Sequence, residues 1–163
     1  MSANILAIAN QKGGVGKTTT TVNLAASLAS RGKRVLVVDL DPQGNATTGS
    51  GIDKASLESG VYQVVLGDAD VQSATVRSKE GGYAVLGANR ALAGAEIELV
   101  QEIAREVRLK NALKAVAEDY DFILIDCPPS LTLLTLNGLV AAGGVIVPML
   151  CEYYALEGIS DLI

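Results

Sequence analysis

Histidine and tryptophan are absent from this sequence, which has only one phenylalanine and five tyrosines among its 163 residues. Without histidine, imidazole bases, histidine–metal sites and Ser-His-Asp triads are excluded. The scarcity of aromatic side chains argues against an aromatic ligand cage. Apolar residues make up 49% of the chain and glycine occurs 17 times. This composition favours close packing of helices on a sheet.

Cysteine is also rare. Cys127 and Cys151 lie far apart in the sequence, with no C-x-x-C pair and no surrounding cluster of possible metal ligands. We therefore predict two free thiols in a reduced cytosol and no disulfide or zinc site.

A basic excess and a membrane segment are missing as well. The formal charge is −5, from 18 acidic and 13 basic residues, so the residues alone do not predict nucleic-acid binding. The start of the chain lacks the features of a signal peptide. The longest apolar stretch, residues 139–150, is interrupted by Gly143, Gly144 and Pro148 and is too short to span a bilayer. We expect a cytoplasmic protein with no membrane partner.

Strand and helix patterns alternate along the chain, which predicts an α/β fold with a mostly parallel sheet and helices on both faces. No linker or repeat divides residues 1–163, so we expect a single domain. Residues 46–82 are difficult to assign beyond a short helix near residues 60–66, and loop and edge structure is expected elsewhere in that region. We expect strands at residues 5–9, 35–38, 83–86, 122–126 and 145–147, and further helices at 18–30, 92–101, 105–118 and from 155 onward.

The end of the sequence has unusual features for a helix terminus. Residues 155–163 begin a helical pattern, but Asp161-Leu162-Ile163 provides no cap, basic last turn or polar tail. We therefore expect the chain to be the N-terminal portion of a longer domain whose C-terminal part is missing.

A glycine-rich segment follows the first predicted strand. Residues 10–19 read NQKGGVGKTT, so Lys17 and Thr18 complete the pattern G-x-x-x-x-G-K-[ST], except that Gln11 replaces its first glycine. Such a turn directs backbone N–H groups at phosphate, and the following helix adds its dipole. Lys17 is predicted to bridge the β- and γ-phosphates, and Thr18 to offer its hydroxyl to Mg²⁺. A surface turn without a ligand is the alternative.

Three carboxylates follow predicted strands. Asp126 ends an apolar strand and is the candidate for holding Mg²⁺ through water. Asp39 and Asp41 follow the second strand; since ligands of parallel sheets lie beyond the carboxyl ends of the strands, both are expected near the phosphates. We predict that Asp41 orients the attacking water and that Asp39 lies closer to the metal. The alternatives are a loop start for Asp126 and a turn-former before Pro42 for Asp41.

Lys12 adds a second cation at the entrance of the loop. A solvated lysine is one interpretation. The other is chemical: charge on a transferring phosphoryl group can be neutralised by a cation supplied in trans, as an arginine finger does. Lys12 could then reach the phosphates of another subunit if two copies met face to face.

Together these segments closely resemble the ParA/Soj family of partitioning ATPases, which have a deviant Walker A phosphate loop. The resemblance rests on KGGVGKT at residues 12–18, VDLDPQGNAT at 38–47, IDCPPS at 125–130, and a fourth stretch from Val147-Pro148 to 152–158. It covers essentially the whole chain and implies the P-loop NTPase fold with ATP and Mg²⁺ as ligands. The family's phosphate-binding residues correspond here to Lys12, Gly13, Gly14, Val15, Gly16, Lys17, Thr18 and Thr19.

The resemblance also implies partners. Family members form an ATP-dependent homodimer in which Lys12 would contact the partner's nucleotide, bind DNA without sequence preference, and are stimulated by a ParB-type centromere-binding protein. Together, the residues and the resemblance predict Lys12, Lys17 and Asp41 in catalysis, and Thr18, Asp39 and Asp126 at the metal. A second hypothesis is a shortened nucleotide- or partner-binding module without ATPase or DNA-binding activity.

Overall fold

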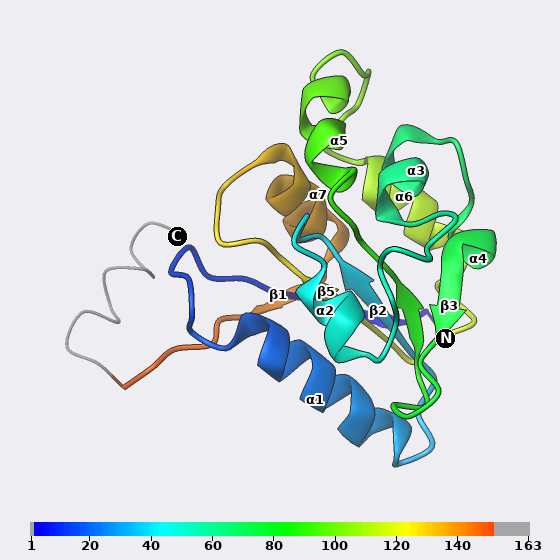
Figure 1. Cartoon of the computed structure of the whole chain (residues 1–163), viewed down its shortest axis with the longest axis vertical. Helices are drawn as coiled ribbons and strands as arrows, with labels where there is room; N and C mark the ends of the chain where they lie inside the picture. The colour runs from blue at the N-terminus through cyan, green and yellow to red at the C-terminus, as the bar shows by residue number, and fades with distance from the viewer. Residues whose placement is uncertain (1, 152–163) are drawn as a thin grey trace.

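The computed structural model describes residues 2–151, and the statements below concern those residues (Figure 1). Six strands form a single sheet in the order β3-β4-β2-β5-β1-β6. All neighbouring pairs are parallel except β3–β4, which is antiparallel. The strands are β1 (Asn4–Ile8), β2 (Val35–Asp39), β3 (Thr75–Arg77), β4 (Ala84–Leu86), β5 (Phe122–Asp126) and β6 (Gly144–Ile146).

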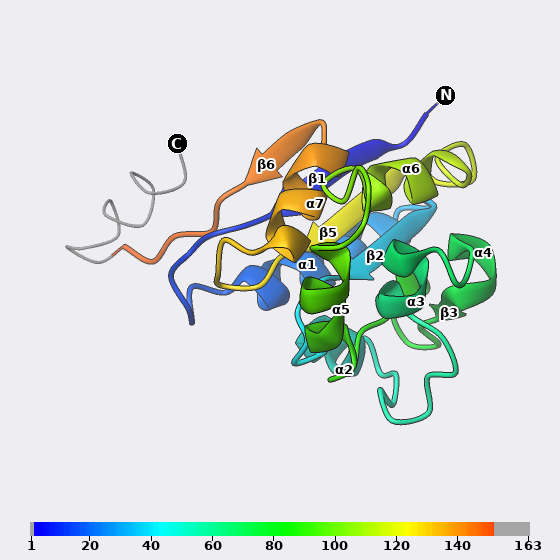
Figure 2. The same cartoon turned by 90° about the horizontal axis from the view of Figure 1, so that it is seen from above.

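Helices cover both faces of the sheet, as predicted. Helix α1 lies on one face and α3, α5, α6 and α7 lie on the other (Figures 1 and 2). The helices are α1 (Lys17–Ala29), α2 (Asn45–Gly49), α3 (Val61–Leu66), α4 (Val71–Ala74), α5 (Leu92–Leu99), α6 (Arg108–Lys114) and α7 (Leu133–Ala141).

Strand β2 illustrates why the sheet is buried on both sides. Its five residues are all buried, and successive side chains of a strand point to opposite faces. Leu36 and Val38 join the apolar cluster under α3, α5, α6 and α7, whereas Val35 and Val37 join the cluster under α1. A continuous apolar run, rather than an alternating one, is therefore what this central parallel strand requires.

The register places two carboxylates side by side. Strands β2 and β5 pair from Val35↔Phe122 to Asp39↔Asp126, so both strands end in aspartate at the same level. Strand β1 pairs with the other side of β5, and Ile8 is opposite Asp126. The carboxyl ends of β1, β2 and β5 therefore meet at one edge, where the loop that follows β1 also begins.

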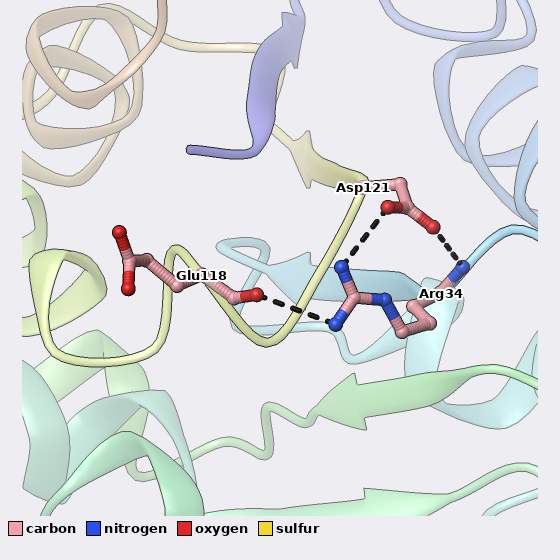
Figure 3. Close-up of polar contacts among 3 residues, drawn as sticks. All are labelled: Arg34, Glu118 and Asp121. Atoms are coloured by element: carbon pink, nitrogen blue, oxygen red, sulfur yellow. Dashed lines mark hydrogen bonds and ion pairs between the residues drawn. The ribbon is translucent and has the colours of Figure 1, made fainter. Parts of the chain in front are cut away.

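The opposite ends of β2 and β5 are joined by charged groups (Figure 3). The main-chain N–H and the guanidinium of Arg34 donate to the Asp121 carboxylate at 2.8 and 3.0 Å, and the guanidinium also donates to the Glu118 carbonyl. The hydrogen bond from the Arg34 side chain holds the pKa of Asp121 below its usual value. These contacts fix the register at the amino ends of the strands that carry Asp39 and Asp126.

The helix expected over residues 105–118 is shorter in the structure. Helix α6 covers only Arg108–Lys114, and its late start is explained by the buried Asn137 of α7, which bonds backbone groups there. The side-chain oxygen of Asn137 accepts from Leu109 N at 3.1 Å, and its amide donates to Arg105 O at 2.7 Å. Ala104, with φ +53°, turns the chain before this cap. A capping residue from another helix left no sign in the local sequence.

Residues 46–82 contain more structure than the sequence predicted. The expected short helix corresponds to α3 and the expected edge structure to β3, but α2 and α4 were not foreseen. The four-residue α4 is capped by the Asp70 side chain, which accepts from Ser73 N at 2.7 Å. The helix expected from residue 155 onward lies outside the described residues.

Candidate active site

The loop between β1 and α1 takes its shape from glycine. Gly14 and Gly16 have φ values of +73° and +89°, a left-handed conformation that glycine adopts without the penalty of a Cβ atom. Gly16 immediately precedes the first residue of α1, so the loop leads directly into the positive end of a 13-residue helix. The predicted phosphate loop thus has the backbone features that anion binding requires.

The side chain of Lys17 closes this loop on itself. Its Nζ donates to the main-chain oxygen of Lys12 at 3.0 Å. The residue is buried, with only 7% of its surface exposed. Burial lowers the pKa of Lys17, while the neighbouring carboxylates of Asp126 and Asp41 act in the opposite direction. A buried ammonium group between a glycine-rich loop and two carboxylates is positioned to neutralise phosphate charge.

The loop is joined to the end of β5 through two threonines of α1. Thr18 Oγ1 donates to Asp126 Oδ2 at 2.7 Å. Thr21 Oγ1 lies 3.1 Å from Asp126 Oδ1 and 3.0 Å from the main-chain oxygen of Lys17, so its one proton is shared between them. Burial raises the pKa of Asp126 to about 6, and the threonine hydrogen bonds oppose that rise.

Asp39, the register partner of Asp126, has different neighbours. Its Oδ2 accepts from the main-chain N and the hydroxyl of Thr47 at 2.8 and 2.7 Å, and its Oδ1 accepts from Asp41 N at 3.1 Å. Asp39 is fully buried, and burial raises its pKa to about 7 against the effect of these hydrogen bonds. Its carboxylate is directed into the loop that follows its own strand.

A cavity of about 440 Å³ opens between the phosphate loop and the segment after β2. Among the predicted site residues, the cavity is lined by Asp41 and by most of the phosphate loop, namely Gly13, Gly14, Gly16, Lys17, Thr18 and Thr19. The remaining predicted residues lie around it and do not line it. Val15 is buried, Lys12 is half-buried in the loop, and Asp39 and Asp126 are fully buried behind the lining.

Three lining residues were not predicted as site residues. Gln43 and Asn45 follow Asp41 in the sequence, and Pro129 comes three residues after Asp126. Thr21, the second donor to Asp126, was also missed. Its position one helical turn after Thr18 places both hydroxyls on the same face of α1, a spacing that could have indicated it.

The oxygen atoms of Thr18 and Asp126 fit a magnesium site. Mg²⁺ prefers oxygen ligands and is commonly held by one or two protein groups together with phosphate and water. Thr18 lines the cavity and contacts the Asp126 carboxylate directly, so both are within reach of a cation bound with phosphates. Within residues 2–151 no cluster of three or more acidic or cysteine side chains could hold a metal by itself.

Comparison with known proteins identifies the family. A family model described as an AAA domain matches residues 3–163. The sporulation initiation inhibitor protein Soj of Bacillus subtilis is 60% identical over 98% of this chain, and the chromosome partitioning protein ParA of Myxococcus xanthus is 53% identical over 97%. The chain belongs to the ParA/Soj family. It spans 63% of the B. subtilis relative and 56% of the M. xanthus relative.

A solved structure supports the fold. The chain superposes with a TM-score of 0.94 on a Mycobacterium smegmatis protein named cobyrinic acid a,c-diamide synthase, with bound ADP and magnesium. That protein is 50% identical to this ParA/Soj chain, and the match covers 98% of this chain and 65% of the other. The six-stranded sheet and its helices therefore form a P-loop NTPase fold.

Two further features of the described residues concern the cysteines and the length of the helices. Cys127 and Cys151 are both free thiols, Cys127 is buried, and burial raises its pKa to about 12. Among the described residues, no helix combines the length and apolar character needed to cross a membrane.

Proposed function

We propose that the protein is a Mg²⁺-dependent ATPase of DNA partitioning that acts in the cytoplasm. In this proposal it binds ATP, forms a homodimer, binds DNA without sequence preference as a dimer, and is stimulated by a ParB-type partner. One observation carries the nucleotide part: Thr18 donates to Asp126 at 2.7 Å beside the buried Lys17, which joins the phosphate loop to a strand-end carboxylate. The partitioning part rests on the names of the Soj and ParA relatives.

In this mechanism the residues of the loop bind and orient the nucleotide. Residues 13–19 supply backbone N–H groups to the phosphates, and Lys17 neutralises their negative charge. Thr18 and Asp126 would hold Mg²⁺, which neutralises charge that develops on the phosphate oxygens. Asp41, which lines the cavity, orients the attacking water. We place Asp39 behind this arrangement, because the hydroxyl that binds it comes from Thr47, which does not line the cavity, whereas Asp126 is bound by the lining residue Thr18.

Lys12 has its proposed role in the dimer. Its main chain is fixed in the loop, since Lys12 N donates to the Asn10 side chain at 3.0 Å and Lys12 O accepts from Lys17. A lysine held at the entrance of the loop could supply positive charge to a nucleotide bound by a second copy.

Two lysine variants of the full-length protein test this function. Lys17→Ala should abolish binding of ATP with Mg²⁺, measured by calorimetry, whereas Lys12→Ala should keep ATP binding and lose the ATP-dependent dimer, measured by light scattering. Lys79→Ala, at an exposed turn, is the control and should behave as wild type. ATP-dependent dimers that persist in Lys12→Ala would exclude the role of Lys12 in trans.

Turnover separates this function from its alternative. The full-length protein should hydrolyse ATP faster when DNA and a ParB-type partner are present. Measurable nucleotide affinity without turnover under those conditions would favour the second hypothesis, a shortened nucleotide- or partner-binding module without ATPase or DNA-binding activity.

A further inference from the structure

The segment after β2 holds Asp41 in a tight turn at the cavity. Asp41 Oδ1 accepts from Gln43 N at 2.9 Å, and the main-chain oxygen of Asp41 accepts from Gly44 N at 2.8 Å. Both bonds lie within residues 41–44, so they shape the turn but do not fix its position relative to the phosphate loop. The contacts that could do so come from buried side chains outside the cavity.

One such anchor is the Asp39 carboxylate. It lies at the end of the central strand β2 and receives Asp41 N on Oδ1, so the backbone at Asp41 is tied directly to the sheet. On Oδ2 it receives the N–H and the hydroxyl of Thr47, eight residues further along. One buried side chain therefore binds the turn at its start and at its end.

A second anchor is the hydroxyl of Thr47. It donates to Asp39 at 2.7 Å and accepts from Ala88 N at 2.9 Å, so it connects the end of β2, helix α2 and the loop after β4. Thr47 is fully buried, and its hydroxyl uses its donor and one of its acceptor positions. Loss of this hydroxyl would leave Ala88 N without that acceptor and remove one donor from Asp39.

The turn at Gly44 also packs closely against the loop after β4. A Cβ atom on Gly44 would lie 2.6 Å from Ala88 O, and Gly44 has a φ of +64°. Glycine at this position allows the turn to approach Ala88, whose N–H is bound by Thr47. The segment from Asp41 to Thr47 is thus held by two contacts outside it, Asp39 at the end of β2 and Ala88 in the loop after β4.

We propose that Thr47 and Asp39 are positioning residues that hold the Asp41 carboxylate at the phosphate cavity. Neither residue lines the cavity, and both act through the backbone of Asp41. This inference rests on the proposed role of Asp41 in orienting water. Removal of the contacts of Thr47 and Asp39 should therefore reduce turnover and leave nucleotide affinity unchanged. None of the hydrogen bonds described for the phosphate loop involves either residue.

Matched threonine variants of the full-length protein provide the test. Thr47→Val keeps the shape and removes the hydroxyl, whereas Thr47→Ser keeps the hydroxyl. We expect kcat for ATP to fall about tenfold or more in Thr47→Val, as for other positioning contacts, and to recover in Thr47→Ser. The Kd for a non-hydrolysable ATP analogue should change less than about twofold in both. Thr48→Val, which removes only a hydroxyl bond to Gly44 O within the same segment, is the control and should keep turnover.

Asp39→Asn is expected to remove one hydrogen bond, the bond that Asp41 N donates to residue 39. An asparagine amide has one acceptor oxygen and one donor group, so it can accept from Thr47 or from Asp41 N, but its NH₂ must face the other donor. We expect the asparagine to keep the two bonds from Thr47 and to lose the bond from Asp41 N. Its kcat should fall as in Thr47→Val, again with unchanged affinity for the analogue.

Amide hydrogen exchange of the nucleotide-free protein tests the positioning without any turnover. Residues 41–47 should exchange faster in Thr47→Val and Asp39→Asn, while residues 13–21 should exchange as in wild type. Unchanged exchange at 41–47, equal loss of turnover in Thr47→Val and Thr47→Ser, or weaker analogue binding in parallel with kcat would overturn the inference. A wild-type protein that does not hydrolyse ATP would refute the proposed function instead, and the exchange result would still decide the positioning.

Discussion

The carboxyl ends of β2 and β5 carry the same residue in the same register but differ in the groups that bind it. Both strands end in a fully buried aspartate, the two residues are register partners, and burial raises both pKa values. Asp126 is bound by hydroxyls of Thr18 and Thr21 from the helix that follows the phosphate loop. Asp39 is bound by Thr47 and Asp41 from its own connection. The donors that meet each carboxylate, rather than its place at a strand end, separate a candidate metal site from a structural anchor.

Removing the anchor should have the largest effect on stability. Asp39→Ala leaves one buried main-chain N–H group, one partly buried N–H group and one buried hydroxyl without their acceptor, so we expect the free energy of unfolding to fall by about 3 kcal/mol. Chemical denaturation measures this change. Asp53→Ala, at an exposed aspartate whose side chain accepts from Ala55 N, is the control and should change the stability much less. An unchanged free energy for Asp39→Ala would contradict the anchoring role.

The two threonines that bind Asp126 should also differ: Thr18 should matter for ATP affinity and Thr21 for stability. Thr18→Val removes a hydroxyl at the cavity, and we expect the Mg²⁺-dependent affinity for ATP to fall by about tenfold, or about 1.4 kcal/mol. Thr21→Val removes a buried hydroxyl behind the cavity, and we expect a loss of about 1 kcal/mol in unfolding free energy with little change in that affinity. Calorimetric titration and denaturation of both variants measure the contrast. Equal losses of affinity would mean that Thr21 belongs to the metal site.

Between about pH 6 and pH 7, the pH dependence of stability should be a smaller effect than the loss of the anchor. The raised pKa of about 7 for Asp39 means that the folded protein retains a proton that the unfolded chain, with an ordinary value of 3.8, has already lost. The stability should therefore fall as pH rises from about 4 to about 7, by at most about 1.4 kcal/mol per pH unit for this group. Asp126, with a pKa of about 6, contributes in the same direction at lower pH.

Denaturation in magnesium-free buffer at about pH 6 and pH 7 measures that slope for the wild type and for Asp39→Asn. The variant should show a flatter dependence, because asparagine does not titrate. A variant with the same slope as the wild type would mean that Asp39 has an ordinary pKa in the folded protein.

Much of the fold could be predicted from the sequence because its signals are local. The apolar run of β2, the strand that ends at Asp126 and the glycine loop before Lys17 each show their structure within a few residues. The start of α6 could not be predicted, since the cap comes from Asn137 of another helix. Short helices such as α4 depend on a single capping residue, Asp70, in a segment with little periodicity.

The candidate site shows the same limit. The phosphate loop and the presence of carboxylates near it follow from motif spacing and from the parallel sheet. The difference between Asp39 and Asp126 does not, because it depends on Thr47 and Thr21, whose hydroxyls reach the carboxylates only after α2 and α1 have packed on the sheet. Spacing and the parallel sheet predict both aspartates at the metal, and our proposal that Asp126 holds it without Asp39 rests on these contacts.

The most direct test of this difference is a comparison of Mn²⁺ binding with ATP, followed by electron paramagnetic resonance, in Asp39→Asn and Asp126→Asn of the full-length protein. Mn²⁺ takes the same oxygen ligands as Mg²⁺ and has a measurable signal. Asp126→Asn should weaken Mn²⁺ binding by about tenfold or more, while Asp39→Asn should stay within about twofold of wild type. Equal weakening in the two variants, or none in Asp126→Asn, would contradict the separate roles assigned to the two aspartates.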